Sequence, residues 1–297
     1  MDKFRGLLIP QSWRNEAMKW MAGRQNPPCY QFIWVPDKNT DDIILRLKLI
    51  KELLKSSTLG SILYVLPKAC ATPFFISKWP KTIIKGKSGY IVSSVYFADQ
   101  WRQVEDYINQ VENEFSKEIH ATCQYQFCYT ETLNEWVDFG AKNYHPGDFR
   151  KGEFLSALKS IKGHWIYWGH AHSKNLGAYG FISIEDLMDH RPKSPFQSTI
   201  WLSCATLVPF RKKSIALDWF ISGSTHCLFA STKSVQTTRN MSLSKLWLEL
   251  ISHYEGLCIA DLIKNTVEKG DKELISLVKD YRLLGYPWSR LQLFPRK

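Results

Sequence analysis

The chain has 297 residues, of which 44% are hydrophobic and 14% aromatic, and its formal net charge is +11. Such a sequence is too apolar for a disordered protein and long enough for one large domain or two modest ones. No apolar run reaches membrane-spanning length, and the amino terminus lacks the apolar core of a signal peptide, so neither a membrane protein nor a secreted one is expected.

Charge and cysteine content also bear on location and partners. The seven cysteines show no CxxC spacing, which favours a reduced, cytoplasmic protein over a disulfide framework. Residues 1–90 contain 15 Lys and Arg against 6 Asp and Glu, whereas residues 91–160 are acidic. This basic amino-terminal third could dock an acidic partner or nucleic acid, or it could be an ordinary basic surface, because no nucleic-acid motif accompanies the charge.

Residues 1–84 alternate between helical and extended patterns. We predict helices over 13–21 and 41–54, strands over 30–35 and 59–66, and a loop-rich segment over 67–87. No catalytic motif lies in this part. We therefore interpret residues 1–84 as an α/β extension that packs on, or completes, the core formed by residues 85–297.

From residue 89 the alternation becomes regular. Strands are predicted over 90–97, 121–130 and 227–231, and near 166–169 and 199–203; helices are predicted over 100–115, 132–139, 154–161, 214–222, 243–253, 259–269 and 272–284. Strands separated by helices predict an α/β fold, with a mostly parallel sheet flanked by helices on both faces.

Two of these strands end at chemically reactive residues. Ile166-Tyr167-Trp168-Gly169 precedes His170, and Thr199-Ile200-Trp201-Leu202-Ser203 precedes Cys204. The intervening segment contains a short helical pattern, as a crossover between parallel strands would. Parallel neighbours present their carboxyl ends at one edge of the sheet, so His170 and Cys204 are expected to lie side by side, which is an arrangement for thiol catalysis.

These residues resemble the CHAT peptidases of the caspase–hemoglobinase clan. Gly169-His170-Ala171 stands where the clan usually has Gly-His-Gly, and Leu202-Ser203-Cys204-Ala205-Thr206 keeps the Cys and Thr of the nucleophile motif, although Leu207 replaces its Gly. Two later segments match in order, Gly223–Val235 and Gly285-Tyr286-Pro287. The resemblance covers residues 85–297.

The resemblance implies a caspase-like cysteine endopeptidase. His170 would be the general base and acid, Cys204 the nucleophile, and the backbone N–H groups of Ala171 and Cys204 the oxyanion donors. No cofactor or metal is implied. The resemblance also suggests a protein substrate, control by a protein regulator or activator complex, and a place in bacterial antiviral defence. Nucleic acid would act only through a partner or through the basic amino-terminal third.

Two alternatives remain open. One is a caspase-like interaction module without turnover. The other is a metal-dependent phosphoesterase, because Gly169-His170-Ala171-His172 also fits a GHxH phrase, although the other motifs of that class are absent. For a peptidase, we expect substrate contacts from His172, Asp186 and Thr206. Metacaspases of the clan carry an acidic residue two places before the Cys, where this chain has Leu202. Glu185, Asp186 or Asp189 could replace it, or all three could be solvated helix residues.

Overall fold

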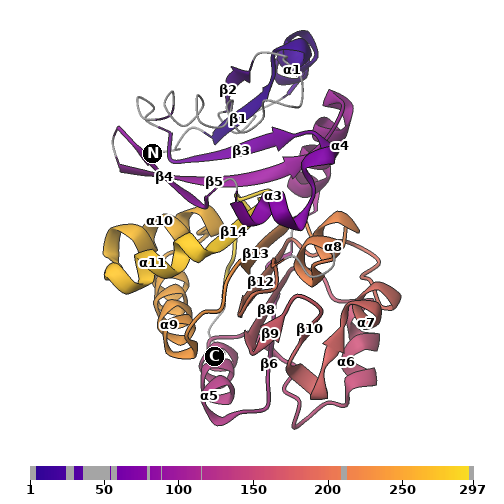
Figure 1. Cartoon of the computed structure of the whole chain (residues 1–297), viewed down its shortest axis with the longest axis vertical. Coiled ribbons are helices and arrows are strands. Elements are labelled where there is room, and N and C mark those ends of the chain that lie inside the picture. Colours follow the sequence, from indigo (N-terminus) through magenta and orange to yellow (C-terminus); the bar gives the residue numbers. More distant parts are fainter. Residues whose placement is uncertain are drawn as a thin grey trace.

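The computed structural model describes residues 5–24, 30–35, 54, 59–78, 81–87, 89–114, 116–208 and 213–293. The helix predicted over 41–54 lies outside these residues except for Leu54. Among the described residues, no helix is both long and apolar enough to cross a bilayer. Figure 1 shows the described elements arranged around one extended sheet.

Eleven of the described strands form the central sheet, in the order β2-β1-β3-β5-β14-β13-β12-β8-β6-β7, with β4 paired to β5. A hairpin-like sheet of three short strands, β9 to β11, follows β8. The central strands are β1 (Arg5–Pro10), β2 (Tyr30–Val35), β3 (Ser61–Leu66), β4 (Ile83–Gly86), β5 (Gly89–Phe97), β6 (Ile119–Cys123), β7 (Lys142–Asn143), β8 (His164–Gly169), β12 (Ser198–Ser203), β13 (Cys227–Ser231) and β14 (Tyr281–Gly285). The short strands are β9 (Ala171–His172), β10 (Asn175–Leu176) and β11 (Ile182–Ser183).

Helices cover both faces of the sheet (Figure 1). One face packs against α1 (Arg14–Ala22), α4 (Trp101–Asn113), α5 (Phe127–Asp138), α9 (Thr237–His253), α10 (Ile259–Lys269) and α11 (Lys272–Asp280). The other face packs against α3 (Pro73–Lys78), α6 (Lys151–Leu158), α7 (Ile184–Asp189) and α8 (Ile215–Ile221). Short 3-10 turns occur at Gln11–Trp13, Lys68–Cys70 and Ala178–Gly180.

Side-chain alternation along the central strands builds these two hydrophobic cores. In β8, Ile166 and Trp168 point into the first core, whereas Trp165 and Tyr167 point into the second. All six residues of β8 and of β12 are buried. A strand covered on both faces has no solvent side, which is why its sequence is a continuous apolar run rather than an alternating one.

The sheet reverses direction once along its main strand order. Strands β2, β1, β3, β5 and β14 are mutually parallel, and so are β13, β12, β8, β6 and β7, but β13 and β14 are antiparallel. The carboxyl ends of the two groups therefore lie at opposite edges of the sheet. This places the end of β5 on the same edge as the beginnings of β12 and β13.

The mostly parallel sheet with helices on both faces confirms the predicted fold class, but some elements differ from expectation. The predicted strand over 121–130 is wrong: β6 ends at Cys123 and α5 begins at Phe127. The sequence also gave no indication of β1 or β4, and β14 occupies the end of the helix expected over 272–284.

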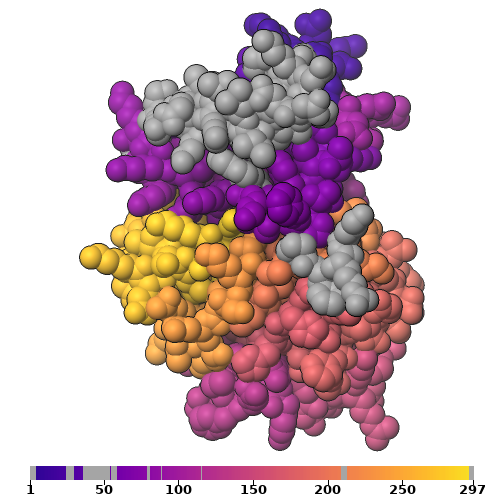
Figure 2. Space-filling model, in the orientation of Figure 1, coloured from indigo at the N-terminus to yellow at the C-terminus, as the bar shows by residue number. Residues whose placement is uncertain are grey.

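The amino-terminal strands belong to the same sheet as the rest of the chain. Strand β3 pairs with β5 along six residues, from Ser61↔Val92 to Leu66↔Phe97. Figure 2 shows the purple amino-terminal residues packed directly against the yellow and orange carboxyl-terminal half. The division of the chain at residue 84 stays a prediction.

Candidate functional site

The register of β8 and β12 determines where His170 and Cys204 lie. The two strands are parallel and paired along their whole length, from His164↔Ser198 to Gly169↔Ser203. His170 and Cys204 are the next residues after the last pair, so their backbones leave the sheet side by side at its carboxyl edge. Two residues 34 positions apart in the sequence are brought together in this way.

The backbone of His170 is held on both sides. Its N–H donates to Oε1 of Gln124 at 2.7 Å, and its carbonyl accepts from the Tyr167 hydroxyl at 2.7 Å and from the Gly177 N–H at 2.8 Å. A Cβ at Gly169 would overlap the Tyr167 hydroxyl oxygen, so only glycine fits before His170. The imidazole itself is exposed to solvent.

The imidazole of His170 packs against the ring of Tyr129. Their centroids are 5.8 Å apart and the planes are nearly perpendicular, at 89°. Tyr129 is 2% exposed, and its hydroxyl shares a hydrogen bond of 2.9 Å with the Thr237 hydroxyl at the start of α9. Tyr129 therefore joins the histidine to the helix that follows β13.

Cys204 sits in a tight turn that the segment after β13 encloses. Ala205 has φ 48°, a left-handed conformation that is uncommon for a residue other than glycine. Its N–H donates to the Lys233 carbonyl at 2.8 Å, and the Leu207 N–H donates to the Ser231 carbonyl at 2.9 Å. These bonds hold the Cys204 turn against the loop formed by residues 231–235.

The Cys204 thiol also contacts this loop. It donates to the Val235 carbonyl at 3.2 Å, and the Val235 N–H points back at the sulfur at 3.4 Å. Within the described residues, no hydrogen bond joins the His170 ring to the Cys204 sulfur. The two side chains leave neighbouring strand ends, but the thiol is directed at Val235.

Other cysteines lie in environments that suppress thiol chemistry. Burial raises the pKa of Cys123 to about 12 and that of Cys227 well above its ordinary value. A thiol whose pKa is raised in this way is a poor nucleophile, because the thiolate is the reactive form. Cys204 and Cys128 are only half-buried, and of these two Cys204 follows a strand that neighbours the histidine strand.

Ala171 presents a backbone N–H outside the ladder of its own hairpin. One position outside β9 and β10, the Gly177 N–H donates to the His170 carbonyl, as it would if the ladder continued with a hydrogen-bonded pair. Hydrogen-bonded and non-hydrogen-bonded pairs alternate in an antiparallel ladder, so the next pair, Ala171↔Leu176, is non-hydrogen-bonded. The Ala171 N–H therefore points away from β10.

The remaining predicted substrate residues lie at separate places. His172 is exposed on the β9–β10 hairpin. Asp186 accepts a hydrogen bond from the Ser183 N–H at 2.7 Å and pairs with Lys151 at 2.6 Å, so its carboxylate caps α7. Thr206 is fully buried two residues after Cys204, where its carbonyl accepts from the Ser214 hydroxyl at 2.7 Å. Substrate contact by these three residues stays a prediction.

Sequence reasoning missed three residues that surround the candidate dyad: Gln124, Tyr129 and Val235. A strand that ended at Cys123 would have placed Gln124 at the same sheet edge as His170, but the predicted strand continued through it. No sequence pattern around Tyr129 or Val235 predicts that these residues lie beside His170 or Cys204. Across the described ranges, no three His, Cys, Asp or Glu side chains come together as metal ligands.

Comparisons with known proteins identify the fold. No protein-family model matches the chain, and no curated protein matches its sequence. Among solved structures, the Arg-specific cysteine proteinase gingipain R has a TM-score of 0.67 at 10% identity, over 100% of this chain and 80% of that one. The complex of Porphyromonas gingivalis RgpB pro- and mature domains gives 0.65 at 10% identity, over 99% and 81%.

A third structure, the Saccharomyces cerevisiae separase–securin complex, matches with a TM-score of 0.51 at 10% identity; 82% of this chain covers 17% of that one. The chain therefore has a caspase-like fold, the fold of a class of cysteine proteases. At 10% identity this likeness defines the fold.

Proposed function

We propose that this protein is a caspase-like cysteine endopeptidase of CHAT type, with His170 as general base and acid and Cys204 as nucleophile. The observation that carries the proposal is the register of β8 and β12, which places a histidine and a half-buried cysteine directly after the paired residues Gly169 and Ser203. The resemblance of their sequence motifs to the CHAT peptidases, and the caspase-like fold, both support it.

In the proposed reaction, the His170 imidazole takes the proton of the Cys204 thiol, and the thiolate attacks the carbonyl carbon of a peptide bond. The Ala171 and Cys204 N–H groups stabilise the negative oxygen of the tetrahedral intermediate. Collapse breaks the carbon–nitrogen bond, and His170 returns the proton to the leaving amine. Water then hydrolyses the thioester, which releases the acid product and the free thiol.

The resting thiol has to leave Val235 before this reaction begins. Its two contacts with the Val235 backbone direct the sulfur into the loop formed by residues 231–235. Catalytic hydrogen bonds often form only in the substrate complex or after activation. We therefore propose that engagement of a protein partner moves this loop and turns the thiol towards His170, in agreement with a regulated peptidase and a role in defence.

The test is co-expression of the protein with the proteins encoded near it, followed by mass spectrometry of the fragments. We expect Cys204→Ala and His170→Ala each to abolish the fragments made by the wild type, because the two residues act as a unit. Cys128→Ala is the matched control, since it removes another half-buried thiol, and His253→Ala is the control for an exposed histidine. Both controls should retain cleavage.

Identical fragments from the wild type and Cys204→Ala would contradict the peptidase proposal. In that case the caspase-like interaction module without turnover becomes the better description. A second readout separates these outcomes from misfolding: every variant should show a cooperative urea transition like that of the wild type.

A further inference from the structure

Carboxyl ends of strands also lie at the edge of the sheet opposite the one that carries His170 and Cys204. In open α/β sheets, ligands bind in the crevice outside the carboxyl ends of two adjacent strands whose connections leave towards opposite faces. Strands β3 and β5 are such a pair. The segment after β3 packs on one core through Cys70 and Ile76, and the helix after β5 packs on the other through Trp101 and Val104.

A pocket of about 620 Å³ occupies this crevice, and ligand sites for small molecules fall in that size range. Residues following or ending both strands line it, among them Lys68 and Ala71 after β3 and Tyr96 and Phe97 of β5. The two loops are joined at the base, because the Lys68 N–H donates to Asp99 at 3.0 Å. Opposite them, α8 and the residues before β12 and β13 form the second wall.

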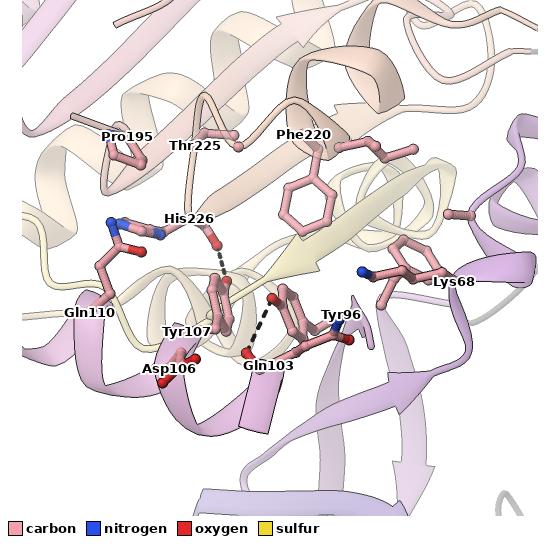
Figure 3. Close-up of a pocket in the computed structure, with 14 residues that line it drawn as sticks. Lys68, Tyr96, Gln103, Asp106, Tyr107, Gln110, Pro195, Phe220, Thr225 and His226 are labelled. Atoms are coloured by element: carbon pink, nitrogen blue, oxygen red, sulfur yellow. Dashed lines mark hydrogen bonds between the residues drawn. The ribbon is translucent and has the colours of Figure 1, made fainter. Parts of the chain in front are cut away.

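The middle of the pocket is aromatic. Tyr96 and Tyr107 stack with centroids 3.9 Å apart and planes 7° from parallel. Figure 3 shows the Phe220 ring projecting from the opposite wall towards this stack. The Tyr107 hydroxyl donates to the His226 carbonyl and accepts from the Tyr286 N–H, so the tyrosine pair is fixed in place. A planar ring can pack against aromatic side chains of this kind.

The two ends of the pocket carry different polar groups. The Lys68 amine lies at one end and the Gln110 amide and the His226 imidazole at the other (Figure 3). Within the described part of the chain, no ion pair involves the Lys68 amine. Burial lowers the pKa of His226, so Lys68 is the cation of this pocket at neutral pH. Asp106 and Gln103 add hydrogen-bond acceptors along α4.

From this arrangement we infer that the crevice between β3 and β5 is a binding site for a planar aromatic or heteroaromatic molecule with one anionic group. The ring packs against Phe220 and Tyr96, the anion pairs with Lys68, and ring N–H groups donate to Asp106 or to an amide oxygen. This site is independent of the peptidase proposal, since it uses no residue of the other edge.

Calorimetric titration of the full-length protein tests the inference with two pairs of probes. Indole-3-carboxylate and its neutral counterpart indole-3-methanol test a carboxylate, and AMP and adenosine test a phosphate. We expect at least one anionic member to bind roughly tenfold more tightly than its neutral partner, as a charge-assisted bond to Lys68 would give. Which pair shows the difference identifies the anion.

Variants then locate the site. Lys68→Met should reduce the affinity for the anionic probe to that of the neutral one, whereas Lys78→Met, which removes an exposed lysine of α3 outside the pocket, should leave it unchanged. Ile221→Glu places a negative charge at an exposed position of the pocket lining and should also reduce the affinity for the anionic probe. The inference fails if no anionic probe binds below about 5 mM, or if Lys68→Met behaves like Lys78→Met.

Discussion

The sulfur of Cys204 lies 3.2 Å from the Val235 carbonyl oxygen and 3.4 Å from the Val235 nitrogen. The loop that makes these contacts is anchored by an ion pair of 2.8 Å between Lys233 and Asp280. Asp280→Ala should loosen the loop and raise the rate of Cys204 alkylation by iodoacetamide about two- to fivefold, since exposed pairs contribute up to about 1 kcal/mol.

The matched control for this measurement is Glu268→Ala, which removes the acidic partner of Lys264 on α10. Its alkylation rate should equal that of the wild type. An unchanged rate in Asp280→Ala would mean that the loop does not restrain the thiol.

Tyr129 should position the His170 imidazole. Tyr129→Phe keeps the ring and should retain most of the thiol reactivity, whereas Tyr129→Leu removes the edge-on contact and should lower it about tenfold. The readout is the pH profile of Cys204 alkylation. With Tyr129→Leu, the rise in rate should move to higher pH, because a displaced imidazole no longer assists ionisation of the thiol. A uniform loss at every pH would indicate a structural role instead.

The sequence predicted the edge that carries His170 and Cys204 because its signals are local. A continuous β-branched and aromatic run followed by a reactive residue is visible in β8 and in β12. The start of α5 is a different case: Cys-Gln-Tyr-Gln-Phe has strand-like composition, and the helix is stabilised by Tyr129, Leu133 and Trp136 packing into the core. That packing depends on partners distant in the sequence.

The same limit applies to β1 and to Val235. Strand β1 is six residues long and lies between β2 and β3, so its pairing partners come from later in the chain. Val235 reaches Cys204 only because β13 returns beside β12 and the loop after β13 encloses the Cys204 turn. Neither relationship has a signature within a short window of sequence.

Glu112 should be a major stabilising residue of the fold. Its carboxylate accepts hydrogen bonds from Tyr30 and Tyr286 at 2.5 and 2.7 Å and pairs with Arg5 and Arg24. These partners come from both ends of the chain. Glu112→Gln leaves two arginines without their carboxylate in a largely buried site, and we expect the free energy of unfolding to fall by about 3 kcal/mol.

Urea denaturation at pH 7 measures that change. Glu131→Gln, on the exposed side of α5, is the control and should alter the unfolding free energy by less than about 0.5 kcal/mol. Equal transition midpoints for the two variants would contradict a stabilising role for the Glu112 cluster.

Removal of residues 1–84 should give insoluble protein. Strand β5 would lose its pairing with β3, and the apolar face that residues such as Leu63 and Val65 cover would be exposed. Expression of residues 85–297 and assay of the soluble fraction tests this. A soluble fragment with the Cys204 reactivity of the full chain would establish that the amino-terminal part is dispensable.

Stability should fall between pH 6.5 and pH 4. Burial lowers the pKa of His164 to about 4, and burial and Lys142 do the same for His120. Below about pH 6.5 the unfolded chain binds protons at these two histidines, whereas the folded chain does so only near pH 4. The free energy of unfolding therefore has its highest value above pH 6.5 and decreases as the pH falls. Each histidine should account for about 3 kcal/mol by pH 4.

Urea midpoints at pH 7, 5.5 and 4.5 test this dependence. His164→Asn can still form a hydrogen bond with the Ser198 hydroxyl and should reduce the change of the urea midpoint with pH. His253→Asn, at an exposed position, should leave that change as in the wild type. A wild-type midpoint that is constant over this range would show that neither histidine is held neutral by the fold.

Because β13 and β14 are antiparallel, carboxyl ends of parallel strands lie at both edges of the sheet, with His170 and Cys204 at one edge and the β3–β5 crevice at the other. A six-residue strand spans about 20 Å, so a partner seated at the His170–Cys204 end leaves the β3–β5 crevice open, and both can be occupied at once. Strands β12 and β13 connect the two ends: residues that precede them, Pro195 and His226, line the crevice, and Cys204 directly follows the last residue of β12. A shift of these two strands along their own axes is therefore the shortest mechanical route by which a small molecule at one end could alter thiol reactivity at the other.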